Sequence, residues 1–177
     1  MKISFIFLAV LLIPYLSLGQ TSVLAQEMTQ KNWATEAQLN TASNSSSATF
    51  GPSLFYNMNN KNQLGLRFLA PVNSGDEGTL SLMAVYRHHF GENKTNLFAE
   101  GTAGTNWYAF GEPRISINAP SLGTNIGVIH HLTEDIAFGG IAGMEWTRTR
   151  FEKNFASNET NSVYLWGRIA LFGSLSF

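Results

Sequence analysis

The stretch that decides the fold is Val163–Phe177, which reads VYLWGRIALFGSLSF. From Val163 onward every second residue is apolar or Gly, whereas the residues between them include Arg168, Ser174 and Ser176. Because successive side chains of a β-strand point to opposite faces, this spacing predicts a strand with one purely apolar face. The strand is about three times as long as a usual globular strand. Such a length suits a tilted crossing of a membrane.

The same alternation recurs upstream and predicts seven more strands. The apolar positions are clearest in the middle of the chain and weakest in the first segment, where Trp33, Ala37 and Leu39 alternate with polar residues. The predicted segments are residues 32–41, 48–58, 62–72, 79–90, 96–108, 121–132 and 136–147. With the final strand, the sequence therefore predicts eight strands.

The links between these segments alternate in length. Short polar links fall at residues 59–61, 91–94 and 133–135, and longer ones at 73–78, 109–120 and 149–161, with a modest one at 43–47. Short turns at one end and longer loops at the other are typical of membrane barrels, and hairpin-length turns favour antiparallel pairing. We therefore expect an all-β fold, an eight-stranded antiparallel up-and-down barrel, with both termini at the short-turn end.

Composition favours a membrane-facing exterior. Only 13% of the residues are charged, against about 25% in a typical soluble domain. Large aromatic residues stand at both ends of the apolar stripes, as in the two aromatic girdles of a barrel in a bilayer. They are Trp33, Tyr56, Tyr86, Phe90 and Phe177 near the short links, and Phe50, Trp107 and Trp146 near the long ones. The alternation of apolar and polar residues would also fit a soluble barrel that binds a ligand in its interior.

The first residues have the features of an export signal. Lys2 precedes the apolar run Ile3–Ile13, and small residues allow cleavage after Gly19 or, alternatively, after Ala25. The apolar run is shorter than the ~20 residues of a spanning helix, which disfavours a transmembrane anchor. We expect a signal peptide over residues 1–19, a polar segment over 20–30 and the barrel over 31–177.

The tail Gly173–Phe177 carries a family resemblance. It ends in an aromatic residue with apolar residues at alternate positions before it, and is similar to the C-terminal signal of outer-membrane proteins. With the barrel pattern, the chain resembles small outer-membrane barrels of the OmpA/OmpX type. The resemblance implies export to the outer membrane, contact with lipid and lipopolysaccharide, and recognition of Leu175 and Phe177 by the barrel-assembly machinery. Gly173 departs from the pattern, since a larger apolar residue is frequent there.

The polar faces of the predicted strands carry charges that must lie inside the barrel. Because buried charges need partners, and eight strands leave room only for side chains or one small ligand, we expect a network that fills the lumen. The alternative is a gated conduit along the same charges. The candidate residues are Glu36, Arg67, Arg87, Glu100, Glu145 and Arg168.

Other chemistry has weaker support in the sequence. His89 and His131 could both point into the lumen, but two imidazoles without a carboxylate are a weak metal site. Barrel enzymes that modify lipid A need a Ser activated by His, and no His has a Ser within two positions. There is no Cys, and the net charge of −1 gives no basic excess for nucleic acid. We expect no catalytic residue, cofactor or metal.

The functional expectation is a non-enzymatic, monomeric barrel that supports envelope integrity or presents loops at the surface. Loops on a rigid scaffold usually carry specificity, so the links 109–120 and 149–161 are the expected contact regions for an unidentified partner. The rival is a narrow channel or small-solute transporter. A lipid A-modifying enzyme and a soluble ligand-binding barrel are less favoured alternatives.

Overall fold

The computed structural model describes residues 31–42, 48–72, 78–110, 115–151 and 160–177. The expected signal peptide over residues 1–19, its alternative cleavage site after Ala25 and the polar segment 20–30 lie outside the described residues. No helix among the described residues is long and apolar enough to cross a membrane.

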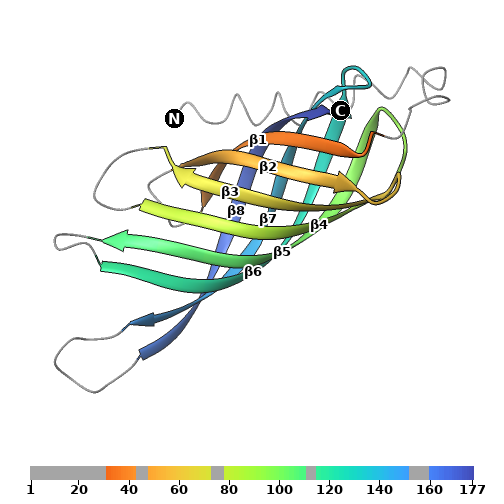
Figure 1. The fold of residues 1–177 in the computed structure, drawn as a ribbon. Coiled ribbons are helices and arrows are strands. Elements are labelled where there is room, and N and C mark those ends of the chain that lie inside the picture. The colour runs from red at the N-terminus through yellow and green to blue at the C-terminus, as the bar shows by residue number, and fades with distance from the viewer. Residues whose placement is uncertain (1–30, 43–47, 73–77, 111–114, 152–159) are drawn as a thin grey trace, which may run out of the picture.

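Eight antiparallel strands form a closed barrel in which every strand pairs with its neighbours in the sequence (Figure 1). Strand β1 pairs with β8, and backbone hydrogen bonds join Trp33 to Phe177 in both directions, at 3.2 and 2.9 Å. The predicted eight-stranded up-and-down barrel is confirmed. The strands are β1 (Trp33–Ala42), β2 (Thr49–Asn57), β3 (Asn62–Pro71), β4 (Gly78–His89), β5 (Thr95–Phe110), β6 (Ile115–His131), β7 (Ile136–Phe151) and β8 (Thr160–Ser176).

The predicted bounds of the two long loops, 109–120 and 149–161, are wrong, because strands occupy part of both ranges. Strand β5 continues to Phe110 and β6 begins at Ile115, while β7 runs to Phe151 and β8 starts at Thr160. These extensions are held by continuous pairing within each hairpin. Over 115–120 the apolar residues Ile115, Ile117 and Ala119 alternate in the opposite phase to Leu122, and Pro120 interrupts the pattern, so the alternation from 121 onward could not be extended into this segment.

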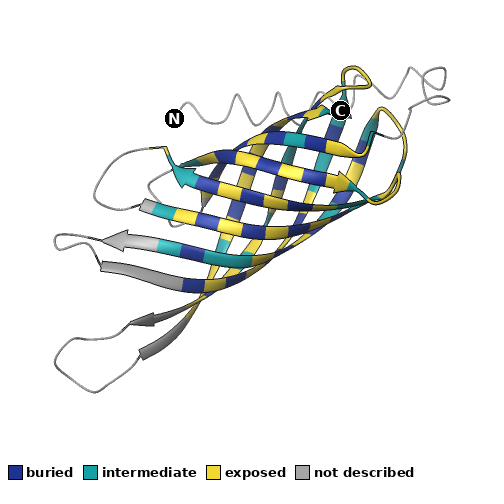
Figure 2. Cartoon of the chain, viewed as in Figure 1, coloured by how far each residue is buried: buried dark blue, intermediate teal, exposed yellow. Residues whose placement is uncertain are grey.

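Side chains alternate between the two faces of the barrel along each strand (Figure 2). On β8 the apolar set from Leu165 to Phe177 is exposed, whereas Arg168, Ala170, Phe172 and Ser174 are buried. The outward residues are large and apolar, with Leu66 59% and Ile126 70% exposed. The exterior is thus apolar, and the interior holds buried charged side chains such as Glu36, Arg67, Arg87, Glu100 and Arg168.

Two of the three short links are stabilised by their own side chains. The Asn59 side-chain oxygen accepts hydrogen bonds from the backbone N–H groups of Lys61 and Asn62, at 3.0 and 2.9 Å. Thr133 does the same for Asp135 and Ile136, at 3.2 and 3.0 Å. Asn and Thr oxygens commonly stabilise turns in this way. These two hairpins are therefore locally defined.

Candidate functional site

The centre of the barrel is occupied by Arg87, whose side chain projects inward from β4 and is fully buried. Its guanidinium donates to both carboxylate oxygens of Glu36 on β1, at 2.5 and 3.0 Å. It also donates to Glu100 Oε2 on β5, at 3.0 Å from Nη2 and 3.3 Å from Nε. Because β1 and β4 are not neighbours in the barrel, the Arg87–Glu36 ion pair crosses the lumen.

Glu100 joins a second arginine to this group. Arg67 on β3 donates to both oxygens of Glu100, at 2.7 and 2.9 Å, and its Nε donates to Ser53 Oγ at 3.2 Å. Asn125 on β6 donates to Glu100 Oε1 at 3.0 Å. We call Glu36, Arg67, Arg87 and Glu100 the central network. It contains two positive and two negative charges, so these buried charges compensate one another, as burial requires.

Three phenylalanine rings surround the same guanidinium. The centroids of Phe55 and Phe98 each lie 4.4 Å from Arg87 Cζ, and that of Phe172 lies 5.3 Å away. Rings at this distance attract a cation through their negative faces. The rings fill the space that the ion pairs leave beside Arg87, so the cross-section of the lumen at this level is packed with side chains.

Each of these rings lies opposite a glycine on the neighbouring strand. The cross-strand pairs are Phe55 with Gly65, Phe98 with Gly127, and Gly139 with Phe172. A Cβ atom at the three glycines would lie 2.5, 2.3 and 2.4 Å from the facing ring. The glycines therefore provide the volume that the rings occupy, a role for Gly where another group approaches closely.

A second group of polar residues lies nearer the long-link end. Arg168 donates from Nε and Nη2 to Asn40 Oδ1, at 3.0 and 2.7 Å, and its Nη1 lies 3.7 Å from Glu145 Oε2. Glu145 also accepts from Asn106 Nδ2 at 2.6 Å, and Ser121 and Thr147 share a hydrogen bond of 2.9 Å. This group ties β1, β8, β7, β5 and β6 together above the central network.

The structure therefore places all six charged candidates inside the barrel, in two groups. Glu36, Arg67, Arg87 and Glu100 come together, and Glu145 and Arg168 form a separate, longer ion pair. Sequence reasoning missed the three phenylalanines and their glycine partners. Phe172 and Phe98 stand on the inward face of their strands, which was a usable signal.

The histidines lie near the short links, and three of the four are hydrogen-bonded to neutral side chains. His88 Nδ1 is 2.8 Å from Asn62 Oδ1, and His89 Nε2 is 3.1 Å from Gln63 Oε1. His130 Nδ1 is 2.7 Å from Thr95 Oγ1. Within the part of the chain that the structure describes, no three His, Asp or Glu side chains gather in a way that could hold a metal ion.

Most aromatic candidates are near strand ends, whereas Trp107 and Trp146 lie inside β5 and β7, which continue to Phe110 and Phe151. Trp33 and Tyr56 stack edge to face with centroids 5.1 Å apart, and the Tyr86 hydroxyl donates to Asn62 Oδ1 at 2.7 Å. The remaining candidates on this surface are partly or largely exposed: Phe50, Phe90, Trp107, Trp146, Leu175 and Phe177. Their outward orientation agrees with contact with a surrounding apolar phase.

Comparison with known proteins supports the fold. No protein-family model matches the sequence, and no curated protein matches it. Among solved structures, Neisserial surface protein A is similar with a TM-score of 0.59 and 16% identity, over 82% of this chain and 96% of that chain. The N-terminal β-barrel domain of Pseudomonas aeruginosa OprF is similar with a TM-score of 0.55 and 15% identity, over 83% of this chain and 98% of that domain. The chain has the fold of small outer-membrane barrels.

Proposed function

We propose that this chain is an integral outer-membrane protein whose barrel is closed by its own side chains and which acts through its surface. The apolar exterior supports the membrane location, since only a closed barrel lets strands satisfy all backbone groups within lipid. The likeness to Neisserial surface protein A and to the OprF barrel domain supports the outer membrane in particular. In that setting the outward face contacts phospholipid and lipopolysaccharide.

The observation that carries the closed lumen is the Arg87–Glu36 ion pair. It crosses the interior from β4 to β1 and is flanked by Phe55, Phe98 and Phe172. An ion following the barrel axis would have to separate a bidentate, fully desolvated pair, which costs several kcal/mol, roughly 3–5 when one partner is lost. A plug of this kind supports a structural or surface-interaction role rather than transport.

Conductance tests this proposal directly. Protein refolded into planar bilayers is expected to show no steady single-channel openings, whereas Arg87→Ala should produce openings because it removes the central side chain. Gly101→Ala, an outward position where an added Cβ meets nothing within 4 Å, is the control. Steady openings of the wild type that change with Arg67 or Arg87 substitution would make it a narrow channel.

The channel remains a second candidate because part of the lumen is polar without being fully hydrogen-bonded. Gln38 Oε1, Asn40 Nδ2 and Thr102 Oγ1 are buried and have no hydrogen-bond partner among the described residues. Such groups can bind water or a small polar solute. The conductance measurement decides between the two candidates, since a plugged lumen holds water locally without passing current.

Location and enzymatic activity are tested separately. Fractionation of expressing cells, followed by gel migration with and without heating, should place the protein in the outer membrane as a heat-modifiable band. A soluble, heat-insensitive band would contradict the membrane assignment. Mass spectrometry of lipid A from the same cells should show an unchanged pattern, whereas a new or missing acyl chain would reveal an enzyme.

A further inference from the structure

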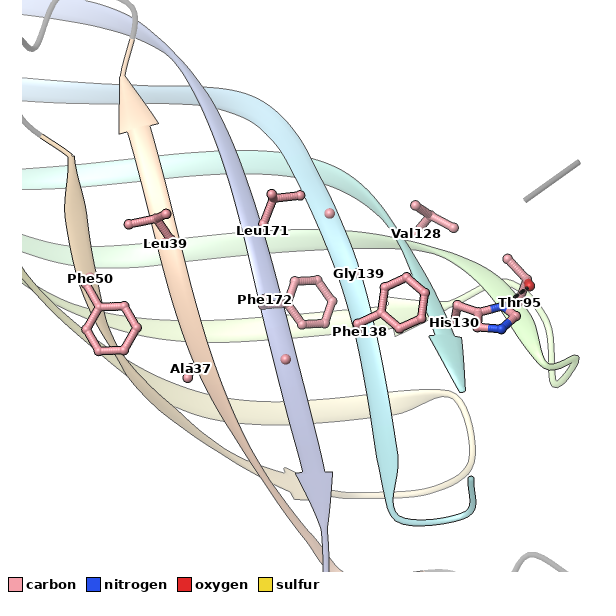
Figure 3. Close-up of a pocket in the computed structure, with 12 residues that line it drawn as sticks. Ala37, Leu39, Phe50, Thr95, Val128, His130, Phe138, Gly139, Leu171 and Phe172 are labelled. Carbon is pink, nitrogen blue, oxygen red and sulfur yellow. Dashed lines mark hydrogen bonds between the residues drawn. The ribbon is translucent and has the colours of Figure 1, made fainter. Parts of the chain in front are cut away.

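The outer surface of the barrel contains a groove with a volume of about 340 Å³ (Figure 3). We call it the outer groove and define it by Leu39, Phe50, Phe138, Gly140, Leu171 and Gly173. Its volume is within the range of about 300–1,000 Å³ seen in small-molecule sites. Because Gly140 and Gly173 have no side chains, the surface is recessed between the neighbouring Leu and Phe residues.

The outer groove runs across the strands along rows of directly paired residues, such as Leu39 with Leu171 and Leu171 with Gly140. One end is at Thr95, the first residue of β5, and at His130, the second-last residue of β6, so it lies beside the short links. The other end is at Phe50, the second residue of β2, and so lies at the long-link end. Figure 3 shows Phe50 and Leu39 on one side and His130 and Thr95 on the other. The groove thus extends from one rim of the apolar belt far across it.

Only the end at the short links is polar. His130 Nδ1 is hydrogen-bonded to Thr95 Oγ1 at 2.7 Å, which leaves Nε2 of the same ring for another partner. Lys94 precedes Thr95 in the chain, and its carbonyl accepts from the His131 N–H at 2.8 Å, so the backbone of this lysine is held beside the groove and its charge acts on His130. The nearby Asp135 carboxylate is paired with Lys31. This end therefore offers a cation and an imidazole to a negative group.

We propose that the outer groove binds a glycerophospholipid from the leaflet that faces the short links. One acyl chain lies along Gly173, Gly140 and Ala37, and the phosphate is bound by Lys94 and His130. The proposal rests on the membrane location proposed above. A long apolar groove with a single cationic end is complementary to an amphiphile with one anionic headgroup.

A second copy of the barrel fits this surface less well. The groove is concave, and its rims are formed by the exposed side chains of Leu39, Phe50 and Leu171. The outside of another barrel is convex over the width of several strands, so it would contact the rims and leave the glycine floor unfilled. A flexible acyl chain can follow the recess, and burial of its methylene groups stabilises the complex.

The glycines supply a matched pair of variants. A Cβ at Gly173 meets no atom within 4 Å, so Gly173→Leu fills the groove without straining the barrel. A Cβ at Gly101 on β5 also meets no atom within 4 Å. Gly101 faces outward but does not line the groove. Gly101→Leu therefore makes the same chemical change on the same kind of surface and serves as the control.

The experiment is native mass spectrometry of the full-length mature protein in detergent, titrated with palmitoyl-oleoyl phosphatidylglycerol. The wild type and Gly101→Leu should retain one lipid with equal affinity. Gly173→Leu should bind about tenfold more weakly, the effect of losing about two methylene contacts. Lys94→Ala combined with His130→Ala should weaken binding of this lipid while leaving binding of the matching diacylglycerol unchanged.

The outcomes separate this inference from the proposed function. Each variant is first checked for heat-modifiable migration, and Gly140→Leu repeats the test if Gly173→Leu does not assemble. Equal lipid retention by wild type and groove variants overturns the lipid site, while a folded, membrane-inserted barrel leaves the proposed function intact. A lipid-free dimer that Gly173→Leu converts to a monomer would assign the groove to self-association. Failure of the wild type to insert into any bilayer overturns the membrane location itself.

Discussion

Arg87 and Glu100 lie directly opposite each other on β4 and β5, and Arg87 also holds Glu36 on the far side of the barrel. Glu100 in turn binds Arg67 through both oxygens. The two arginines are therefore unequal. Glu100 keeps a guanidinium partner if either arginine is lost, whereas Arg87 is the arginine that binds Glu36 among the described residues.

We predict that Arg87→Met destabilises the barrel more than Arg67→Met. Losing Arg87 leaves the buried Glu36 carboxylate without a cation, which costs about 3–5 kcal/mol in a buried pair. After Arg67→Met, Glu100 keeps Arg87. Urea unfolding in lipid vesicles, followed by tryptophan fluorescence, measures both free energies of unfolding. Equal losses of unfolding free energy in the two variants would show that the stability of the barrel does not depend on whether Glu36 keeps a cation.

The two buried glutamate sites should also differ. Glu100→Gln leaves two buried arginines with Glu36 alone, so we expect a loss of about 3 kcal/mol or more in the unfolding free energy. Glu145 lies 3.7 Å from Arg168 and is 15% exposed. Glu145→Gln should therefore cost less than Glu100→Gln, because the Gln amide oxygen can still accept from Asn106 and Arg168 keeps its hydrogen bonds to Asn40. A larger loss of unfolding free energy for Glu145→Gln than for Glu100→Gln would show that the Arg168–Glu145 pair stabilises the barrel more than the central network does.

The glycine–phenylalanine pairs predict which glycines tolerate a methyl group. Gly139→Ala places a Cβ 2.4 Å from Phe172 Cζ and 2.3 Å from the Val128 carbonyl oxygen, so overpacking should destabilise by about 1–3 kcal/mol. Gly101→Ala meets no such neighbour and should be neutral or stabilising by about 0.5–1 kcal/mol. The shift in the urea midpoint measures both. Similar midpoints for the two variants would mean that both the Phe172 ring and the β6 backbone at Val128 can shift to admit the methyl group.

A charge on the outer face tests the apolar surroundings. Leu66 is 59% exposed in the middle of β3, so Leu66→Arg would be nearly neutral in a protein surrounded by water. In a bilayer the same change should cost about 2–4 kcal/mol. The free energy of unfolding is measured in vesicles, with Lys61→Arg at the exposed short link as control. A cost below about 0.5 kcal/mol for Leu66→Arg, the usual range for surface substitutions, would contradict the membrane location.

The role of the last residue in assembly is open to a cellular test. Phe177 is 61% exposed and contacts Trp33 through its backbone, so Phe177→Ala should leave refolding in vitro nearly unchanged. If the tail is an assembly signal, the fraction of heat-modifiable protein in cells should fall several-fold. Phe90→Ala removes another exposed ring at the same end and is the control. An equal fall in both variants would indicate a general loss of interfacial anchoring.

Hydrophobic alternation was sufficient to predict the strands and the direction in which most side chains point. It identified β8 from Val163 onward because one face is wholly apolar. It could not predict the Arg87–Glu36 pair, because the two residues are 51 positions apart and meet only through the curvature of the closed barrel. Nor did it predict that Ile115–Pro120 is strand, because the alternation of Ile115, Ile117 and Ala119 is in the opposite phase to that of the residues from Leu122 onward. The local sequence pattern therefore predicted which face of a strand each side chain occupies. Contacts across the lumen depend on how the closed barrel brings distant strands together.

Pairing of β1 with β8 has a consequence for how the chain reaches its final state. Ala34 lies opposite Ser176, so the contact that completes the sheet joins the two most distant parts of the described chain. Until it forms, the sheet has two free edges whose N–H and C=O groups can pair with other molecules. Non-local pairing of this kind is slow, since most of the chain must be ordered first. The unclosed sheet is therefore the species most exposed to aggregation, and we expect productive folding to depend on keeping its two edges unpaired until β1 meets β8.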